Sequence, residues 1–391
     1  MQGFPPPPDK RVDRSNALMV GPYNRWAYLH MRTIFPSAPV RNSDVARPIP
    51  FAIDSGIVGL QVPRADGSLA SFGDFLRETY TDSLLVATPE RLVFEHYDNA
   101  MHASQPHQMM SVTKSFAGLF ALLAGIDESG RVTDIVPELS AASAFSDATV
   151  GQVLDMTNSM DFNEDYADPN SSIWRYGMAL GWLESPAGTT ADSLYDFLVT
   201  LGKDPAHAHG DVFRYQTPKT DVVNWITNRA TGKSFQDTMS DALWTRIGTE
   251  AETYVLLDRC GTLVAGGGLN AAPRDLMRFA MMMLGGGEGV VPESVIETLE
   301  RGGSRTAFAD GPEATGFMSK DWSYRAQWWI RHTPGREAIS AIGVHGQWIY
   351  IDRARQVAIV KQSSQPVSSD PATDQFVINA FDALIDHLGK G

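Results

Sequence analysis

The sequence of 391 residues is poor in cysteine and in positive charge, and it has no long apolar run. Its single cysteine, Cys260, excludes an intrachain disulfide, so the redox compartment stays open. Lys and Arg number 32 against 46 Asp and Glu, which gives a formal charge of −14. This balance disfavours general binding to nucleic acid or to anionic membranes, because both require clustered basic residues.

Because no run of 18 apolar residues is present, we expect no transmembrane helix. The first residues, MQGFPPPPDKRVDRSN, contain no apolar stretch after their basic residues and are not typical of a secretory signal. A cytoplasmic location is therefore the default expectation, although a chain whose signal had been removed would look the same.

Runs rich in β-forming residues lie towards both ends of the chain, and helical patterns fill the middle. Residues 83–98 predict a hairpin that turns at Pro89-Glu90, and residues 339–351 and 356–363 predict a second hairpin. Helices are expected within 109–125, 149–157, 191–201, 218–230, 234–247, 272–284 and 373–388. The expected fold class is α/β (α+β), with an antiparallel sheet that is built from both chain termini, flanked by helices and interrupted by an inserted, mainly helical domain.

We divide the chain into three parts on this basis. Residues 1–50 are expected to form an irregular arm, residues 51–125 and 265–391 the sheet domain, and residues 126–264 the helical domain. Within the last part, residues 158–189 are rich in Asn, Asp, Ser and Gly and predict a long loop. Loops of that length inside a compact domain are usually functional, so we expect this one to border the active site.

The stretch MMSVTKSFAGLFALLAG, residues 109–125, carries the first chemical signal. Ser111 and Lys114 are three positions apart, so on a helix they share a face. A serine hydroxyl becomes a nucleophile when a base takes its proton, and lysine can be that base where burial and a helix N-terminus disfavour its charge. Taken alone, Ser-x-x-Lys is also a common helix start with a solvated lysine, but the apolar residues that follow favour the chemical interpretation.

Two later stretches supply partners for this pair. Tyr215 precedes the helix expected at 218–230, and its phenol could pass a proton to a leaving group if it lies near the lysine. Residues 343–348, GVHGQW, head a late strand whose backbone N–H groups could form an oxyanion hole with that of Ser111. The alternatives are a core tyrosine with a satisfied hydroxyl and a strand with a glycine bulge and a surface histidine.

Taken in order, Ser-x-x-Lys, a tyrosine about 100 residues on and a His-Gly strand near the end resemble the penicillin-recognising serine hydrolases, which include class C β-lactamases, DD-peptidases and related esterases. The stretches 110–115 (MSVTKS), 152–169 (QVLDMTNSMDFNEDYADP), 327–329 (QWW) and 343–347 (GVHGQ) are similar to one branch, the 6-aminohexanoate-dimer hydrolases. The resemblance covers residues 75–390 and implies the β-lactamase/transpeptidase-like fold.

The resemblance also implies roles for single residues. It makes Ser111 the nucleophile, Lys114 the general base and Tyr215 the proton shuttle. It places the oxyanion hole at the N–H of Ser111 and at the strand that carries His345, Gly346 and Trp348. The substrate-binding positions that it implies are Tyr166, Gly177, Trp182, Thr217, Trp328 and Gln347.

Three departures from the family pattern bear on the substrate. Residues 215–217 read Tyr-Gln-Thr, without the asparagine that holds a lactam side-chain amide. Residues 345–347 read His-Gly-Gln, without the lysine that attracts a β-lactam carboxylate. Gly177 stands where an acidic residue of the family binds the substrate's ammonium group. The first two departures favour a linear amide or an ester over penicillins, and the third weakens the expectation of strong amide-oligomer activity.

We therefore expect a serine hydrolase that cleaves amide or ester bonds of small linear substrates through an acyl-enzyme, with no metal and no organic cofactor. Its partner is expected to be a small-molecule substrate and neither nucleic acid nor a membrane, with a homodimer as one option. The alternatives are a β-lactamase or D-amino peptidase, a catalytically silent acyl-binding module, and a metallohydrolase that uses HAHGD at 207–211. That stretch lacks the histidine that such metal sites carry beside the aspartate.

Overall fold

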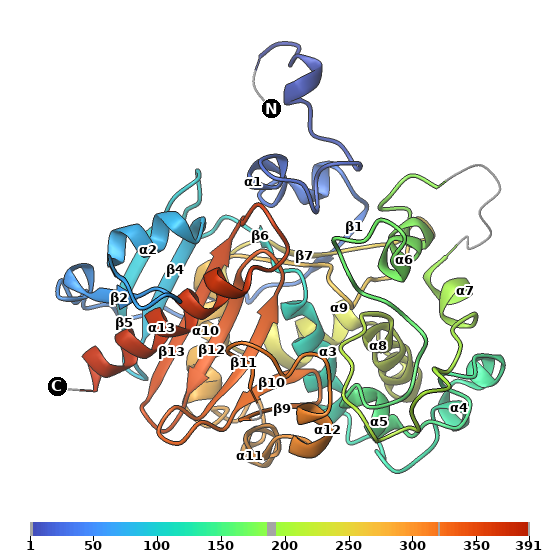
Figure 1. Ribbon diagram of the computed structural model, residues 1–391. Coiled ribbons are helices and arrows are strands. Elements are labelled where there is room, and N and C mark those ends of the chain that lie inside the picture. Colours follow the sequence, from blue (N-terminus) through green and yellow to red (C-terminus); the bar gives the residue numbers. More distant parts are fainter. Residues whose placement is uncertain (1–2, 186–192, 320, 390–391) are drawn as a thin grey trace.

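The computed structural model describes residues 3–185, 193–319 and 321–389. At its centre is a seven-stranded antiparallel sheet in the order β5-β4-β13-β12-β11-β10-β9 (Figure 1). Its strands are β4 (Thr81–Ala87), β5 (Leu92–Tyr97), β9 (Trp322–Arg325), β10 (Trp328–Arg331), β11 (Ala338–Gly343), β12 (Gln347–Asp352) and β13 (Val357–Ser363). Because β4 pairs with β13, strands from the two ends of the sequence lie side by side, as the sequence predicts.

Alternate residues of the central strands enter two apolar clusters, one on each face of the sheet. In β12, Ile349 and Ile351 belong to one cluster, whereas Trp348 and Tyr350 belong to the other. The first face is covered by α3 (Val112–Leu123), α10 (Pro273–Leu284) and α11 (Glu293–Arg301). The second face is covered by α2 (Phe72–Glu78) and α13 (Pro371–Leu388), so the sheet is buried between two helical layers.

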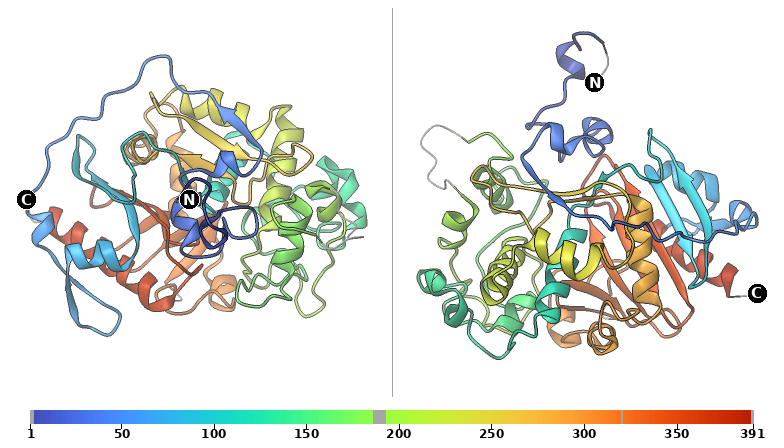
Figure 2. Two further views of the ribbon diagram at one scale, coloured as in Figure 1. Left: turned by 90° about the horizontal axis from the view of Figure 1, so that it is seen from above. Right: turned by 180° about the vertical axis from the view of Figure 1, so that it is seen from behind.

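The inserted part lies beside α3 and forms the green and yellow half of the molecule in Figures 1 and 2. Its helices are α4 (Val132–Ile135), α5 (Val150–Leu154), α6 (Ser172–Leu180), α7 (Leu194–Leu198), α8 (Pro218–Thr231) and α9 (Phe235–Thr238), followed by a π-helical turn at Met239–Trp244. The long helix α8 packs on α3 and α5. This contact joins the helical part to the helix that starts at Ser111.

Two smaller sheets complete the fold. One has the order β1-β7-β8-β6, with β1 (Ser37–Val40), β7 (Thr253–Leu256), β8 (Leu269–Ala271) and β6 (His107–Gln108), and the other pairs β2 (Gln61–Pro63) with β3 (Leu69–Ser71). The remaining short elements are α1 (Tyr23–Ala27), α12 (Arg305–Ala309) and the 3-10 turns Pro8–Lys10, Met31–Thr33, Ile57–Gly59 and Pro137–Ala141. No helix among the described residues has the length and apolar character needed to cross a membrane.

The structure corrects several details of the sequence-based expectation. The described part of 158–189 is not all loop, because it contains α6, which buries one apolar face and ends at the left-handed Gly181. Residues 1–50 are not wholly irregular, since they contain α1 and β1. Residues 339–351 form two strands rather than one, because positive φ angles at His345 (62°) and Gly346 (88°) turn the chain back. The helix expected at 191–201 spans only Leu194–Leu198, and residues 191–192 lie outside the described part.

Candidate active site

Ser111 stands at the N-terminal end of α3, and its hydroxyl does not cap the helix. The chain enters the helix from β6 through Met110, whose φ of 48° is a conformation that non-glycine residues rarely adopt. Ser111 is the N-cap residue, yet its side chain makes no capping hydrogen bond. Its Oγ accepts a hydrogen bond from Lys114 Nζ over 2.8 Å, so the one-turn spacing seen in the sequence does bring the two groups together.

Lys114 is buried, with only 1% of its surface exposed. Its Nζ donates to Ser111 Oγ and to the carbonyl oxygen of Gly266. Burial lowers the pKa of Lys114 to about 8, although the carboxylates of Glu164 and Asp221 act in the opposite direction. A substantial fraction of this amine is therefore neutral near physiological pH, which is the condition for a lysine base.

Tyr215 lies on the other side of Lys114. The centroid of its ring is 5.1 Å from Lys114 Nζ, and the ring stacks on Trp329 with a centroid distance of 5.2 Å. Burial raises the pKa of Tyr215 well above its usual value, while a hydrogen bond with Ser111 acts to lower it. The phenol is therefore protonated at neutral pH and can donate a proton next to the serine.

A carboxylate that the sequence analysis did not single out organises the loop before α6. Glu164 Oε1 accepts hydrogen bonds from Tyr166 OH (2.9 Å) and from Thr217 Oγ1 (2.6 Å), and its Oε2 accepts one from Thr217 N (2.5 Å). Two predicted binding residues are thus held by one side chain. No local pattern distinguishes Glu164 from the acidic residues beside it, because Thr217 is 53 positions away.

A second carboxylate, Asp221, binds the backbone N–H of Gly266, the residue whose carbonyl oxygen accepts a hydrogen bond from Lys114 Nζ. Asp221 is one helical turn after Thr217 on α8 and is 1% exposed. Its Oδ1 accepts from Gly266 N (3.1 Å) and its Oδ2 from Tyr176 OH (2.7 Å), while burial raises the pKa of Asp221. The four-residue spacing from Thr217 was the available sequence signal, since it places both residues on one face of a helix.

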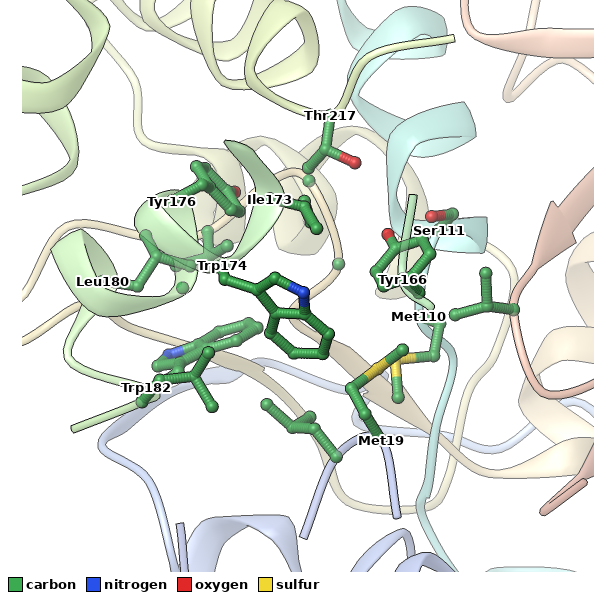
Figure 3. A pocket seen from close by; sticks show the side chains of 17 residues that line it. Met19, Met110, Ser111, Tyr166, Ile173, Trp174, Tyr176, Leu180, Trp182 and Thr217 are labelled. Carbon is green, nitrogen blue, oxygen red and sulfur yellow. The ribbon is translucent and has the colours of Figure 1, made fainter. Parts of the chain in front are cut away.

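A hollow of about 630 Å³, its open mouth included, lies in front of Ser111 (Figure 3). Four of the predicted binding residues, Tyr166, Gly177, Trp182 and Thr217, line it. The other lining residues are Leu18, Met19, Met110, Ile173, Trp174, Tyr176, Leu180, Leu183, Val264, Gly266, Gly267 and Val344. Apart from the nucleophile and a few hydroxyl groups, the described walls are apolar or aromatic, and none of their side chains carries a charge.

Three other predicted site residues do not line the cavity, and their side chains make contacts within the fold. The Trp328 indole is fully buried and donates to the carbonyl oxygen of Ser115 (2.9 Å), so it packs beneath α3 and is not a wall of the cavity. Trp348 belongs to the opposite face of the sheet, where its ring lies 5.6 Å from that of Phe381. The Gln347 side-chain amide exchanges hydrogen bonds with the backbone of Ser363, which ties β12 to β13.

His345 and Gly346 form a turn next to the site without facing the cavity. His345 is fully buried, its Nδ1 lies 2.7 Å from Gln365 O, and burial lowers its pKa to about 4. The imidazole is therefore neutral and does not attract an anionic substrate. A Cβ added at Gly346 would lie 2.6 Å from Gln365 Nε2, which explains the glycine.

The strand end nearest to Ser111 is formed by residues 343–344. A Cβ added at Gly343 would lie 3.0 Å from Ser111 N, so β11 ends directly beside the nucleophile. The next residue, Val344, lines the cavity, whereas Trp348 does not. The residue that follows Trp328, Trp329, is the tryptophan that packs on Tyr215. Trp328 and Trp329 lie on opposite faces of the sheet, because successive side chains of a strand alternate between the two faces.

The two histidines of the HAHGD stretch make hydrogen-bond contacts with nearby protein groups. His209 Nε2 lies 2.9 Å from Asp147 Oδ1, and His209 Nδ1 accepts from Ser159 N (2.8 Å). His207 Nε2 lies 3.3 Å from a guanidinium nitrogen of Arg214. Within the described ranges, no group of three or more His, Cys, Asp or Glu residues could hold a metal ion. The geometry therefore gives the metallohydrolase alternative no support.

Comparisons with known proteins identify the family of the chain. The family model named Beta-lactamase matches residues 74–381. The 6-aminohexanoate-dimer hydrolase of Paenarthrobacter ureafaciens is 35% identical over 360 residues, which cover 90% of this chain and 87% of that protein. The solved structure of a "Putative 6-aminohexanoate-dimer hydrolase from Bacillus anthracis" has a TM-score of 0.87 and 29% identity, and the match covers 98% of this chain and 99% of that one.

More distant structures share the fold alone. A D-stereospecific amidohydrolase from Streptomyces sp. has a TM-score of 0.58 and 14% identity over 80% of this chain and 98% of its own. The expected fold class, the expected resemblance and the expectation of a hydrolase are thus confirmed. The chain belongs to the beta-lactamase family and is a serine hydrolase of the kind that acts on amides and esters.

Proposed function

We propose that this chain hydrolyses amide or ester bonds of small linear substrates with an uncharged acyl part, through an acyl-enzyme on Ser111. The observation that carries the proposal is the 2.8 Å contact between Lys114 Nζ and Ser111 Oγ at the edge of an uncharged, mainly apolar cavity. The pair supplies a nucleophile with its base, and the cavity supplies space for a hydrocarbon chain.

In the first step, Ser111 Oγ attacks the carbonyl carbon while its proton passes to Lys114 Nζ. The carbonyl oxygen becomes an oxyanion, which accepts hydrogen bonds from the N–H groups of Ser111 and Val344. The position of Val344 on the cavity wall, directly after the strand end beside Ser111 N, supports this second donor. It replaces Trp348, which is not among the residues that line the cavity.

In the second step, the bond to the leaving nitrogen or oxygen breaks. Tyr215 donates its phenolic proton to the leaving atom and regains a proton from the ammonium of Lys114. The raised pKa of Tyr215 supports this role, because the phenol starts in its protonated form. Water then attacks the acyl-enzyme and gives its proton to neutral Lys114. The ester bond to Ser111 Oγ breaks, the acid is released, and the ammonium of Lys114 returns the proton to Ser111 Oγ.

The walls of the cavity favour uncharged acyl groups. An ammonium or carboxylate at the far end of an acyl chain would lose its hydration without gaining an opposite charge from the described lining residues. Carboxylesters and linear amides of unbranched acids therefore fit best. Hydrolysis of 6-aminohexanoate oligomers is a second candidate, which the 35% identity to the Paenarthrobacter protein favours and the glycine at 177 disfavours.

A panel of substrates tests the proposal. The full-length protein is given p-nitrophenyl butyrate, butyryl anilide, 6-aminohexanoate dimer, a D-alanyl peptide and benzylpenicillin, and the adduct is sought by intact-protein mass spectrometry. We expect continued turnover of the butyryl ester and a butyryl adduct on Ser111. Ser111→Ala removes both, whereas the exposed control Ser104→Ala keeps both. One equivalent of product with no further release would identify a silent acyl-binding module instead.

Three further expectations stay predictions. These are a small molecule as the partner, a homodimer as one option for assembly, and a cytoplasmic location. Light scattering coupled to size-exclusion chromatography measures the assembly, and fractionation of the cells that produce the protein locates it.

A further inference from the structure

Part of the cavity wall comes from a segment that the family match does not include. The match to the beta-lactamase model begins at residue 74, yet Leu18 and Met19 line the cavity in front of Ser111. Figure 3 shows Met19 at the lower side of the cavity, with its side chain next to Trp174 and Met110. Figures 1 and 2 show α1 and the chain that follows it to β1 at one end of the molecule, between the sheet and the helical part, whereas the first residues extend away from it.

Residues 14–35, called here the arm segment, are fixed on the side of the sheet. Tyr28 is fully buried, and its OH donates to Leu18 O over 2.6 Å. Gln108 N donates to Tyr28 O (3.0 Å), which ties the segment to β6 just before the nucleophile. Asn24 Nδ2 donates to Gln365 O (2.7 Å), the same oxygen that His345 contacts. The buried histidine turn therefore supports the arm segment.

The arm segment also reaches the opposite wall. Arg14 Nη1 donates to Gly181 O (3.2 Å) at the end of α6. The ring of Phe35 lies 5.7 Å from that of Trp182, which is itself a wall residue. The segment thus bridges the two sides of the cavity, and its position relative to Ser111 is set by contacts at both ends.

We propose that the arm segment sets the acyl-chain specificity of this site, with Met19 as the determining residue. The inference rests on the proposed function and adds to it the residue that limits the length of the acyl chain. Leu18 is a fixed part of the wall, since it is 7% exposed and its carbonyl is held by Tyr28. Met19 is only partly buried, and its flexible thioether chain closes the remaining space.

The size of the effect follows from burial of methylene groups. Each further methylene that enters an apolar site strengthens binding about fourfold, until the chain meets a wall. In the wild-type protein, kcat/KM should rise with chain length and then fall where the acyl chain meets Met19. Met19→Ala opens the wall and moves the optimum to longer chains, whereas Met19→Phe moves it to shorter ones.

The experiment measures kcat/KM of the full-length protein for p-nitrophenyl esters from acetate to dodecanoate. We expect Met19→Ala to raise the decanoate-to-butyrate ratio about tenfold or more, the effect of two or more additional methylene groups. The matched control is Val20→Ala, since Val20 is the next residue, is 42% exposed and is not among the lining residues. This control should leave the ratio within about twofold of wild type, which is less than one buried methylene contributes.

Two results separate failure of this inference from failure of the proposed function. If wild type turns over esters but Met19→Ala and Met19→Phe change all rates in proportion, the arm segment is only structural and the inference is wrong. If wild type neither turns over any ester nor forms an adduct on Ser111, the proposed function fails and the inference falls with it. Thermal unfolding of each variant shows whether its fold is retained, and Met19→Phe provides the second test if Met19→Ala unfolds.

Discussion

Lys114 Nζ lies 2.8 Å from Ser111 Oγ at the start of α3, and the same amine donates to Gly266 O. The helix places the two side chains one turn apart, and the tertiary structure buries the amine away from solvent. Burial of the amine prevails over the nearby carboxylates of Glu164 and Asp221, so its pKa falls.

The first prediction concerns the dependence of hydrolysis on pH. Burial lowers the pKa of Lys114 to about 8, and only the neutral amine can accept the serine proton. Acylation should therefore be lost as pH falls through the lysine's pKa, with kcat/KM decreasing about tenfold per pH unit on the acidic side. A pH–rate profile for p-nitrophenyl butyrate from pH 6 to 10, corrected for spontaneous hydrolysis, measures this limb, and a flat profile would contradict the lysine base.

Asp221→Asn tests whether a nearby carboxylate influences the pKa of Lys114. The Asp221 carboxylate raises the pKa of Lys114, so its removal should move the acidic limb to lower pH. Asparagine is nearly isosteric and can still accept from Gly266 N, so the Gly266 peptide should keep its position. Glu138→Gln, which removes an exposed carboxylate paired with Arg229, should leave the limb where it is. An unchanged limb in Asp221→Asn would show that this carboxylate does not influence the base.

Tyr215→Phe should separate substrates by their leaving groups. A p-nitrophenolate leaves without being protonated, whereas an anilide nitrogen needs a proton. Loss of the phenol should therefore lower kcat for butyryl anilide by about 10² to 10⁴, and much less for p-nitrophenyl butyrate. Tyr195→Phe is the control, because the Tyr195 ring lies against that of Trp225 (4.2 Å between centroids) and Tyr195 is not among the residues that line the cavity. Equal losses on both substrates would argue against a role in leaving-group protonation.

Gly118→Ala should destabilise the fold, although it changes none of the proposed catalytic residues. A Cβ at Gly118 would lie 1.8 Å from Ala326 O, so α3 would have to move away from the sheet. Such overpacking costs about 3 kcal/mol of unfolding free energy. Gly59→Ala is the control, because a Cβ added there has no heavy atom within 4 Å. Denaturant unfolding of both variants gives the comparison, and equal stability would show that α3 can shift without strain.

Local patterns account for the elements that could be predicted. The hairpin of β4 and β5, the helices α3, α8 and α10, and the antiparallel sheet built from both termini follow from periodicity and turn residues, which act over a few positions. The helix at Ser172–Leu180 does not follow from local pattern, because its short apolar face lies among many polar residues. The position of the arm before residue 50 could not be predicted for a different reason, because its contacts are with residues far along the chain.

The sequence by itself determined that the side chains of Ser111 and Lys114 meet, because the two residues lie one helical turn apart. Only the tertiary structure decided what surrounds them. The packing of distant segments places Glu164 beside Thr217, Asp221 beside Gly266, and Met19 at the cavity wall. The same packing leaves His345, Trp328 and Trp348 out of the cavity lining. The physical reason is that burial and long-range hydrogen bonds depend on which segments pack together, and no pattern of neighbouring residues records that.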